Sequence, residues 1–268
     1  MTWSKGSQWK TSWSRRGHLG IQRISGQMWF FNLRQSPDVW RYIAPLASPF
    51  PFADPPPFWF GYVWRGANAV NGAGMRFGES PQAADGVRGE GISVVPANDP
   101  SVGRMETGGY FAPSLFVDTP SLEYLPGQVV VVLGTVTQLT VPNQVNVKMF
   151  VDRTFAGQAT YDGVYGPQTS PFFFEQVGIP NSPCVHGFVA GAGTPSGEQI
   201  AQWFDDTKAN LEIAEIAGMT TDRWSATSAQ PAVPNPLPNL ATGQDLTLVS
   251  IGVPAAPTNS QISAYFTY

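Results

Sequence analysis

The chain has 268 residues, of which 13% are charged and 13% aromatic, and its formal net charge is −4. The aromatic content excludes a disordered chain, and the single cysteine, Cys184, excludes an internal disulfide framework and is expected to be a small buried residue. No apolar run is long enough to span a membrane. The start lacks a signal peptide, so we expect synthesis in the cytoplasm, with release as part of a particle left open.

Positive charge is concentrated at the start of the sequence. Residues 1–37 hold six of the 15 basic residues and no acidic one, so nine basic and 19 acidic residues remain, a formal charge of −10. We therefore expect residues 1–24 to form an arm that docks on other subunits or on copies of this chain. Nucleic acid ranks lower as a partner, because the rest of the chain is acidic. The expected assembly contacts are Trp3, Lys5, Trp9, Lys10, Trp13, Arg15 and Arg16.

Strand-like patterns follow the arm. Residues 26–33 predict a short aromatic strand, and residues 34–44 predict one helical turn, since Val39, Tyr42 and Ile43 have helix-like spacing. Residues 58–65 then alternate between two apolar faces, which is typical of a central strand. One face carries Phe58, Phe60, Tyr62 and Trp64, and the other carries Trp59, Gly61, Val63 and Arg65.

Further short strands are predicted from bounded apolar runs over 73–80, 87–97 and 108–118. Residues 127–139 contain four consecutive valines, typical of a strand buried on both faces. The stretch 147–163, VKMFVDRTFAGQATYDG, predicts a strand, a tight turn and a returning strand. We interpret Asp152 as the residue that forms this corner and not as part of a site.

One helix is predicted near 195–210. Thr194 is the expected N-cap and Pro195 the first helical residue, and Ile200, Trp203 and Phe204 form an apolar stripe that docks on the sheets. The predicted organisation is an arm over 1–24, a β-sandwich over 25–217 and a Pro-rich extension with terminal strands over 218–268. Whether the extension completes the sandwich is left open.

The order of these segments resembles the concanavalin A-like lectin and glucanase superfamily, and within it the laminin G-like domains, over residues 55–210. The motifs that carry the resemblance are PFWFGYVWR, GQVVVVLGTV, VNVKMFVDRTFAGQA and CVHGFVAGAGTPSGEQIAQWFDDTKA. The resemblance implies an all-β jelly-roll sandwich of two antiparallel sheets with one late helix. The family turn reads Asp-Gly, whereas this chain has Asp152-Arg153, so we expect a different or longer turn.

The sequence predicts no enzyme, metal or cofactor. The paired-carboxylate motif E-x-D-x-x-E of the β-glucanases is absent, and Glu90 and Glu175 stand alone. His18 and His186 do not have metal-ligand spacing, and His186 is interpreted as a structural residue of a sheet. Calcium at the rim is not excluded, although its candidate ligands are better explained as turn formers. These are Asp85, Asp99, Asp118 and Asp162.

Three functions remain at this point. The first is a non-catalytic structural subunit that self-assembles or forms part of a larger particle, such as a virion, a tail or a surface assembly. The alternative is a lectin-like carbohydrate-binding module, in which exposed aromatic side chains stack on sugar rings. A glycoside hydrolase with an unrecognised site is the third. The candidate glycan contacts are Trp59, Tyr62, Trp64, Tyr110 and Tyr161.

Overall fold

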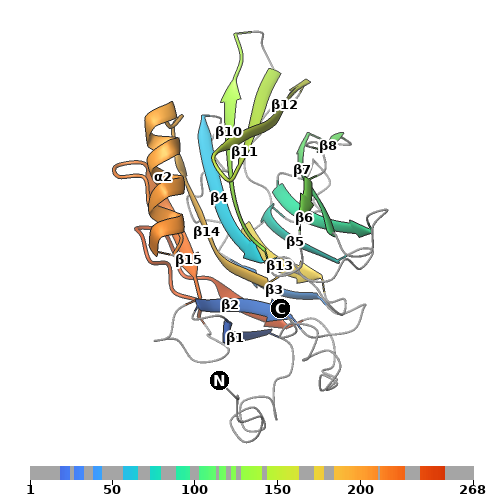
Figure 1. The fold of residues 1–268 in the computed structure, drawn as a ribbon, viewed down its shortest axis with the longest axis vertical. Helices are drawn as coiled ribbons and strands as arrows, with labels where there is room; N and C mark the ends of the chain where they lie inside the picture. Colours follow the sequence, from blue (N-terminus) through green and yellow to red (C-terminus); the bar gives the residue numbers. More distant parts are fainter. Residues whose placement is uncertain are drawn as a thin grey trace, which may run out of the picture.

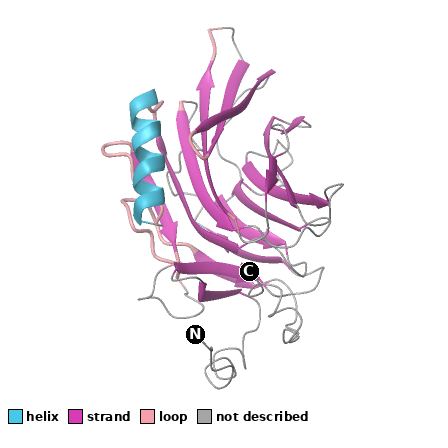
Figure 2. Cartoon of the chain, viewed as in Figure 1, coloured by secondary structure: helices cyan, strands magenta, loops and turns pink. Residues whose placement is uncertain are grey.

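In the residues that it describes, the structure, a computed structural model, contains two antiparallel sheets and one helix (Figure 1). It describes residues 19–24, 27–32, 39–43, 57–65, 73–79, 89–96, 103–112, 115–118, 122–124, 128–140, 144–162, 172–177, 184–210, 212–226 and 236–250. Strands dominate the chain, and the helix lies along one side of it (Figure 2). The predicted all-β jelly-roll sandwich with one late helix is confirmed.

Each sheet contains eight strands. Sheet A has the order β1 (Leu19–Ile24), β2 (Gln27–Asn32), β14 (Cys184–Ala192), β4 (Phe58–Arg65), β10 (Val129–Gln138), β11 (Gln144–Val151) and β12 (Thr154–Asp162), with β15 (Thr220–Ser225) paired to β14. Sheet B has the order β16 (Thr247–Ser250), β3 (Val39–Ile43), β13 (Phe172–Val177), β5 (Ala73–Glu79), β6 (Gly89–Pro96), β7 (Gly103–Ala112) and β8 (Leu115–Asp118), with β9 (Leu122–Tyr124) paired to β7.

The predicted boundaries between arm, sandwich and extension do not coincide with the segments that build the two sheets. Strand β1 begins at Leu19, inside the predicted arm, and joins sheet A through β2. The predicted extension supplies β15 to sheet A and β16 to sheet B, so it contributes to both layers of the sandwich. The arm therefore covers at most residues 1–18, which lie outside the described residues.

The predicted helical turn within 34–44 is wrong, because Val39–Ile43 forms β3. This segment pairs with β13 on one side and β16 on the other. Its β-branched and aromatic residues suit a strand, and the two partners supply pairing that the local spacing did not reveal. Tertiary pairing therefore overrode a weak local signal.

The middle of sheet A is buried on both faces, as the sequence predicted. In β10, Val130, Val131, Val132 and Leu133 are all buried. In β4, Trp59 and Val63 pack with the helix in one core cluster, while Phe60 and Tyr62 face the other way and are also buried. A Cβ at Gly61 would lie 2.6 Å from the Trp203 ring, so glycine at this position lets the helix approach the sheet.

Helix α2 (Gly197–Asn210) is fixed at its start by a capping box. The Ser196 amide donates to Gln199 Oε1 at 2.8 Å, and the Gln199 amide donates to Ser196 Oγ at 3.2 Å. The predicted N-cap, Thr194, is therefore wrong, because Ser196 fills that position. The predicted apolar stripe is confirmed, since Trp203 and Phe204 are buried and Ile200 packs against the same core.

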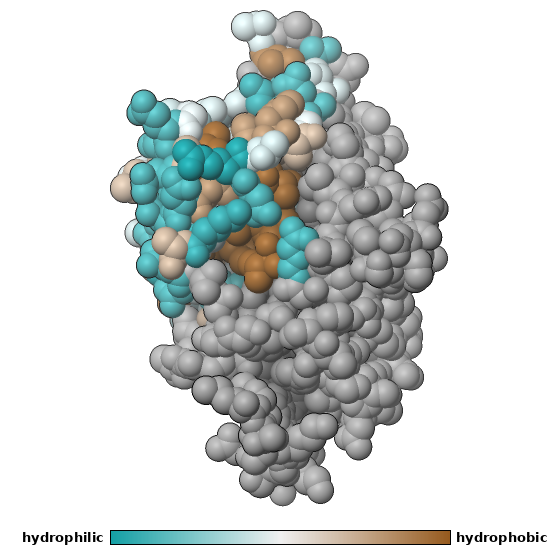
Figure 3. Space-filling view, in the orientation of Figure 1, coloured by the Kyte–Doolittle hydropathy of each residue, from teal (hydrophilic) through white to brown (hydrophobic). Residues whose placement is uncertain are grey.

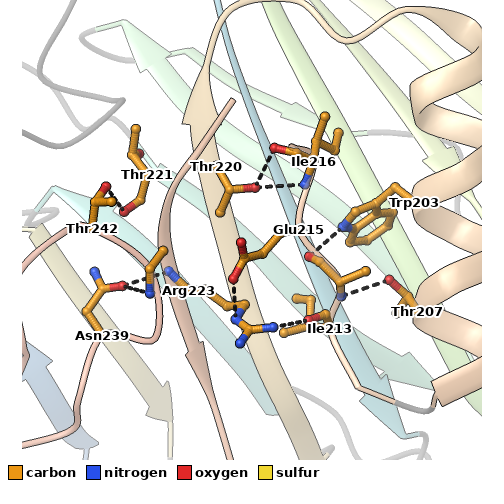
Figure 4. A network of polar contacts seen from close by, with 12 residues as sticks. Trp203, Thr207, Ile213, Glu215, Ile216, Thr220, Thr221, Arg223, Asn239 and Thr242 are labelled. Atoms are coloured by element: carbon orange, nitrogen blue, oxygen red, sulfur yellow. Dashed lines mark hydrogen bonds and ion pairs between the residues drawn. The ribbon is translucent and has the colours of Figure 1, made fainter. Parts of the chain in front are cut away.

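The segment after the helix is held against it by side-chain hydrogen bonds (Figure 4). Trp203 Nε1 donates to the Ala214 carbonyl at 2.9 Å, and the Ala214 amide donates to Thr207 Oγ1 at 3.1 Å. Ile213 and Ile216 add their side chains to the core cluster between α2 and sheet A. The outer face of the sheet is thereby closed over Trp59.

The turn between β11 and β12 contains two residues, Asp152 and Arg153, with φ values of 48° and 75°. Both fall in the left-handed region that a two-residue hairpin turn of type I′ requires. The prediction of a different or longer turn than the family's Asp-Gly turn is therefore wrong, because Arg153 adopts a conformation that glycine usually supplies. The corner role of Asp152 is confirmed.

Asp152 does more than turn the chain. Its Oδ1 accepts the Val131 amide of β10 at 3.1 Å and contacts Lys208 Nζ of α2 at 3.1 Å. Arg153 pairs with Asp205 of the same helix at 2.8 Å. The hairpin tip is thus tied to both β10 and α2.

We expect Asp152→Ala to lower the free energy of unfolding by about 1–2 kcal/mol, because the part-buried Val131 amide loses its acceptor. Arg153→Gly is the matched control and should cost less than about 1 kcal/mol, since it removes an exposed ion pair but relieves the positive φ. Urea unfolding of both variants measures the difference. Equal costs would show that the carboxylate of Asp152 adds nothing to the turn.

Candidate functional site: an exposed hairpin surface

Two of the predicted glycan contacts are buried. Trp59 and Tyr62 are 0% exposed, so neither can stack on a sugar, and that prediction is wrong for both. Both faces of β4 contribute to the interior, so its alternating aromatics are packing residues. Trp64, Tyr110 and Tyr161 belong to β4, β7 and β12, but their side chains lie outside the described residues, as do the predicted arm contacts.

The predicted titratable and metal candidates give no clustered site. His186 is buried in β14. Asp118 and Asp162 end β8 and β12, and their side chains are not described, nor are Asp85 and Asp99. Within the described part of the chain, no group of three or more His, Cys, Asp or Glu residues could hold a metal ion. The described helix is also too short and polar to cross a membrane.

Burial raises the pKa of the Asp222 carboxylate from 3.8 to about 6. Buried groups with such pKa values are candidates for catalysis. However, Thr221 Oγ1 donates to one carboxylate oxygen at 2.8 Å, and Asn239 Nδ2 donates to the other at 2.9 Å. A Cβ at Gly243 would overlap the carboxylate, so no substrate can reach it from that side. We assign Asp222 a structural role.

That role is to hold the strap, residues 236–246, over the free edge of β15. Leu237 and Leu246 close the strap with two backbone hydrogen bonds, and both side chains are buried. The Arg223 amide donates to Asn239 Oδ1 at 3.1 Å (Figure 4). The Leu240 amide donates to the Arg223 carbonyl at 2.7 Å. The strap therefore covers an edge that could otherwise pair with another chain.

An exposed surface is found on the β11–β12 hairpin. Phe155 is 52% exposed, and its ring packs edge to face on Phe150 with 5.7 Å between the ring centroids. Phe150 pairs with Phe155 and also with Leu133, which belongs to the cluster under α2, so both rings lie on the helix side of sheet A. In Figure 3, hydrophilic residues cover most of the left of the view, where α2 lies, and hydrophobic residues are gathered beside them.

Two polar pairs continue this face along the hairpin. Lys148 is opposite Gln158, and Asn146 is opposite Thr160, to which its Nδ2 donates at 3.2 Å. A bulge beside Phe150 keeps Phe155 and Gln158 on the same face although they are three residues apart. We call this face the hairpin surface, and it consists of four exposed residues and the Phe150 ring beneath them. These are Lys148, Phe150, Phe155, Gln158 and Thr160.

The hairpin surface was missed at the level of sequence, although its signal was present. Period-two alternation in 147–163 places Lys148 and Phe150 on one face, and the two-residue turn places Phe155 opposite Phe150. What the sequence does not contain is the position of α2, which covers β10 and β4 but leaves Phe155 exposed.

No family model matches the sequence, and no curated protein matches it. Among solved structures, a heptameric SAP-like pentraxin from Limulus polyphemus has a TM-score of 0.42 and 11% identity, covering 63% of this chain and 76% of the pentraxin. The binding domain of botulinum neurotoxin serotype C1 has a TM-score of 0.42 and 13% identity, covering 70% of this chain and 51% of that one. This chain thus spans about half the length of the neurotoxin domain.

A carbohydrate-binding module, the CBM40 of the Ruminococcus gnavus IT-sialidase bound to alpha2,3 sialyllactose, has a TM-score of 0.37 and 12% identity, covering 55% of this chain and 82% of the module. All three structures are concanavalin A-like jelly rolls, the fold class that the sequence motifs predicted.

Proposed function

We propose that the chain is a non-catalytic carbohydrate-binding module whose ligand stacks on Phe155 at the hairpin surface. The observation that carries this proposal is the 52% exposure of a Phe ring on a paired strand, beside polar side chains. A sugar ring presents an apolar face of C–H groups and a rim of hydroxyls. The Phe155 ring suits the face, while Gln158 and Thr160 suit the hydroxyls.

The surface is also held in place before any ligand binds. Phe150 supports the Phe155 ring from below, and the strand pair fixes the spacing of both. The hairpin tip is tied to α2 by the Asp152 and Arg153 ion pairs and to β10 by the Asp152 hydrogen bond. Because little needs to be ordered on binding, even a small contact area can give measurable affinity.

We expect Phe155→Ala to weaken glycan binding by about tenfold or more, since it removes the stacking contact, worth about 1–2 kcal/mol. The fold should remain stable, because the side chain is already exposed. A glycan array with the wild-type chain identifies the ligand, and titration calorimetry with both proteins measures the affinity.

The matched control is Leu240→Ala, which truncates the other exposed large hydrophobic residue in the described region, on the strap. This variant should bind the glycan as the wild-type chain does. Equal affinities for wild type and Phe155→Ala would show that the hairpin surface is not the site. A wild-type chain that binds nothing on the array would refute the function itself.

A structural subunit is the second candidate, favoured by the charge distribution. Residues 1–37 carry six basic and no acidic side chains, while the remaining residues carry a formal charge of −10. Contact between the first part of one copy and the acidic body of another would build a ring or filament. Because β1 begins at Leu19, the mass in solution of the full chain should be compared with that of a chain lacking residues 1–18.

A further inference from the structure

We propose that the hairpin surface recognises a sugar bearing a carboxylate or sulfate group and that Lys148 contacts the anion. This inference rests on the proposed function and adds to it the chemical class of the ligand. The structure describes four basic side chains, and they differ in whether a carboxylate pairs with them. Three form such a pair, whereas Lys148 has no carboxylate partner among the described residues.

The three pairs have N···O distances of 2.8 to 3.1 Å. They are Arg153 with Asp205, Lys208 with Asp152, and Arg223 with Glu215. Among the described residues, no hydrogen bond or ion pair reaches the exposed Lys148 ammonium. Lys148 therefore presents a positive charge that its described neighbours do not neutralise.

The position of Lys148 couples this charge to the aromatic ring. Lys148 lies two residues before Phe150 on β11 and directly opposite Gln158 on β12. Two residues along a strand span about 7 Å, and the side chains of both lie on the same face. A lysine side chain can extend over that distance, so a sugar stacked on Phe155 can place a substituent against the ammonium group.

Around the Phe155 ring, Lys148 is the charged group that we expect to determine the preference for acidic over neutral sugars. At the hairpin tip, the charges of Arg153 and Asp205 cancel, as do those of Asp152 and Lys208. The chain beyond residue 37 has a formal charge of −10, so its net charge repels anions. An exposed ion pair gives modest energy, and we therefore expect about three- to tenfold preference for an acidic sugar over its neutral counterpart.

The test uses oligosaccharides that match the best-binding glycan and differ in one group, which is a hydroxymethyl, a carboxylate or a sulfate. Dissociation constants are measured for the wild-type chain, Lys148→Gln, Lys148→Arg and Phe155→Ala. The wild-type chain should prefer one or both acidic sugars by about three- to tenfold, and added salt should reduce the preference. Lys148→Gln should remove the preference but retain affinity for the neutral sugar, and Lys148→Arg should preserve it.

The outcomes separate the two proposals. Equal wild-type affinity for neutral and acidic sugars, or an equal loss for both in Lys148→Gln, overturns the role of Lys148 and leaves the proposed function standing. If Phe155→Ala binds every sugar as the wild-type chain does, or no sugar binds at all, the proposed function fails and this inference fails with it. The carboxylate and sulfate arms identify which anion is recognised.

Discussion

Trp203→Ala should destabilise the protein by about 3–5 kcal/mol, a large fraction of the stability of a typical domain. Trp203 is 1% exposed, and its ring packs against Trp59 at 6.3 Å and Phe204 at 5.1 Å between centroids. Its indole also donates to the Ala214 carbonyl. Truncation would open a cavity between α2 and sheet A and leave that carbonyl without its donor.

Urea unfolding followed by tryptophan fluorescence and circular dichroism measures this cost. The matched variant Trp203→Phe keeps an aromatic ring but loses the hydrogen bond, so it should cost clearly less than Trp203→Ala. A loss below about 1 kcal/mol in Trp203→Ala would show that α2 does not depend on this contact.

Asp222→Asn should stabilise the protein at neutral pH, by up to about 3 kcal/mol. Burial raises the pKa of Asp222 from 3.8 to about 6, so the folded protein binds this proton more tightly than the unfolded chain does. The stabilisation linked to this proton is fully present below pH 4 and is lost as the pH rises through 6. A shift of this size corresponds to about 3 kcal/mol.

The asparagine amide removes this titration and fits the same contacts. Its oxygen can accept from Asn239, and its NH₂ can donate to Thr221 Oγ1, whose own proton would then turn from residue 222 to the Ala190 carbonyl 3.4 Å away. Unfolding free energies of wild type and Asp222→Asn should therefore agree near pH 4 and separate progressively up to pH 7. A constant difference across this range would contradict the titration of Asp222, and a destabilised variant at pH 7 would contradict the assigned geometry.

The elements that the sequence predicted correctly are those with strong periodicity or a long apolar run. The valines of 129–132 and the stripe at Ile200, Trp203 and Phe204 depend on burial alone, which alternation reveals. The N-cap could also have been found, because Ser196 and Gln199 have the spacing of a capping box. Strand β3 could not, because its partners β13 and β16 lie far away in the sequence.

The candidate site was only partly accessible from the sequence. Strand alternation and turn length place Lys148, Phe150 and Phe155 on one face, but exposure depends on where α2 docks. The same limit explains why Trp59 was misjudged, since the helix that buries it begins more than a hundred residues later. That Lys148 has no carboxylate partner among the described residues likewise depends on which carboxylates reach the other basic side chains, and that follows from tertiary packing.

The central claim, that the hairpin surface binds the ligand, is tested most directly by amide chemical-shift changes during titration with the best-binding array glycan. The account predicts that the largest changes fall on amides between residues 146 and 160, and that Phe155→Ala abolishes them. Saturable changes confined to other strands, with residues 146–160 unaffected, would contradict it and place the site elsewhere on the sandwich.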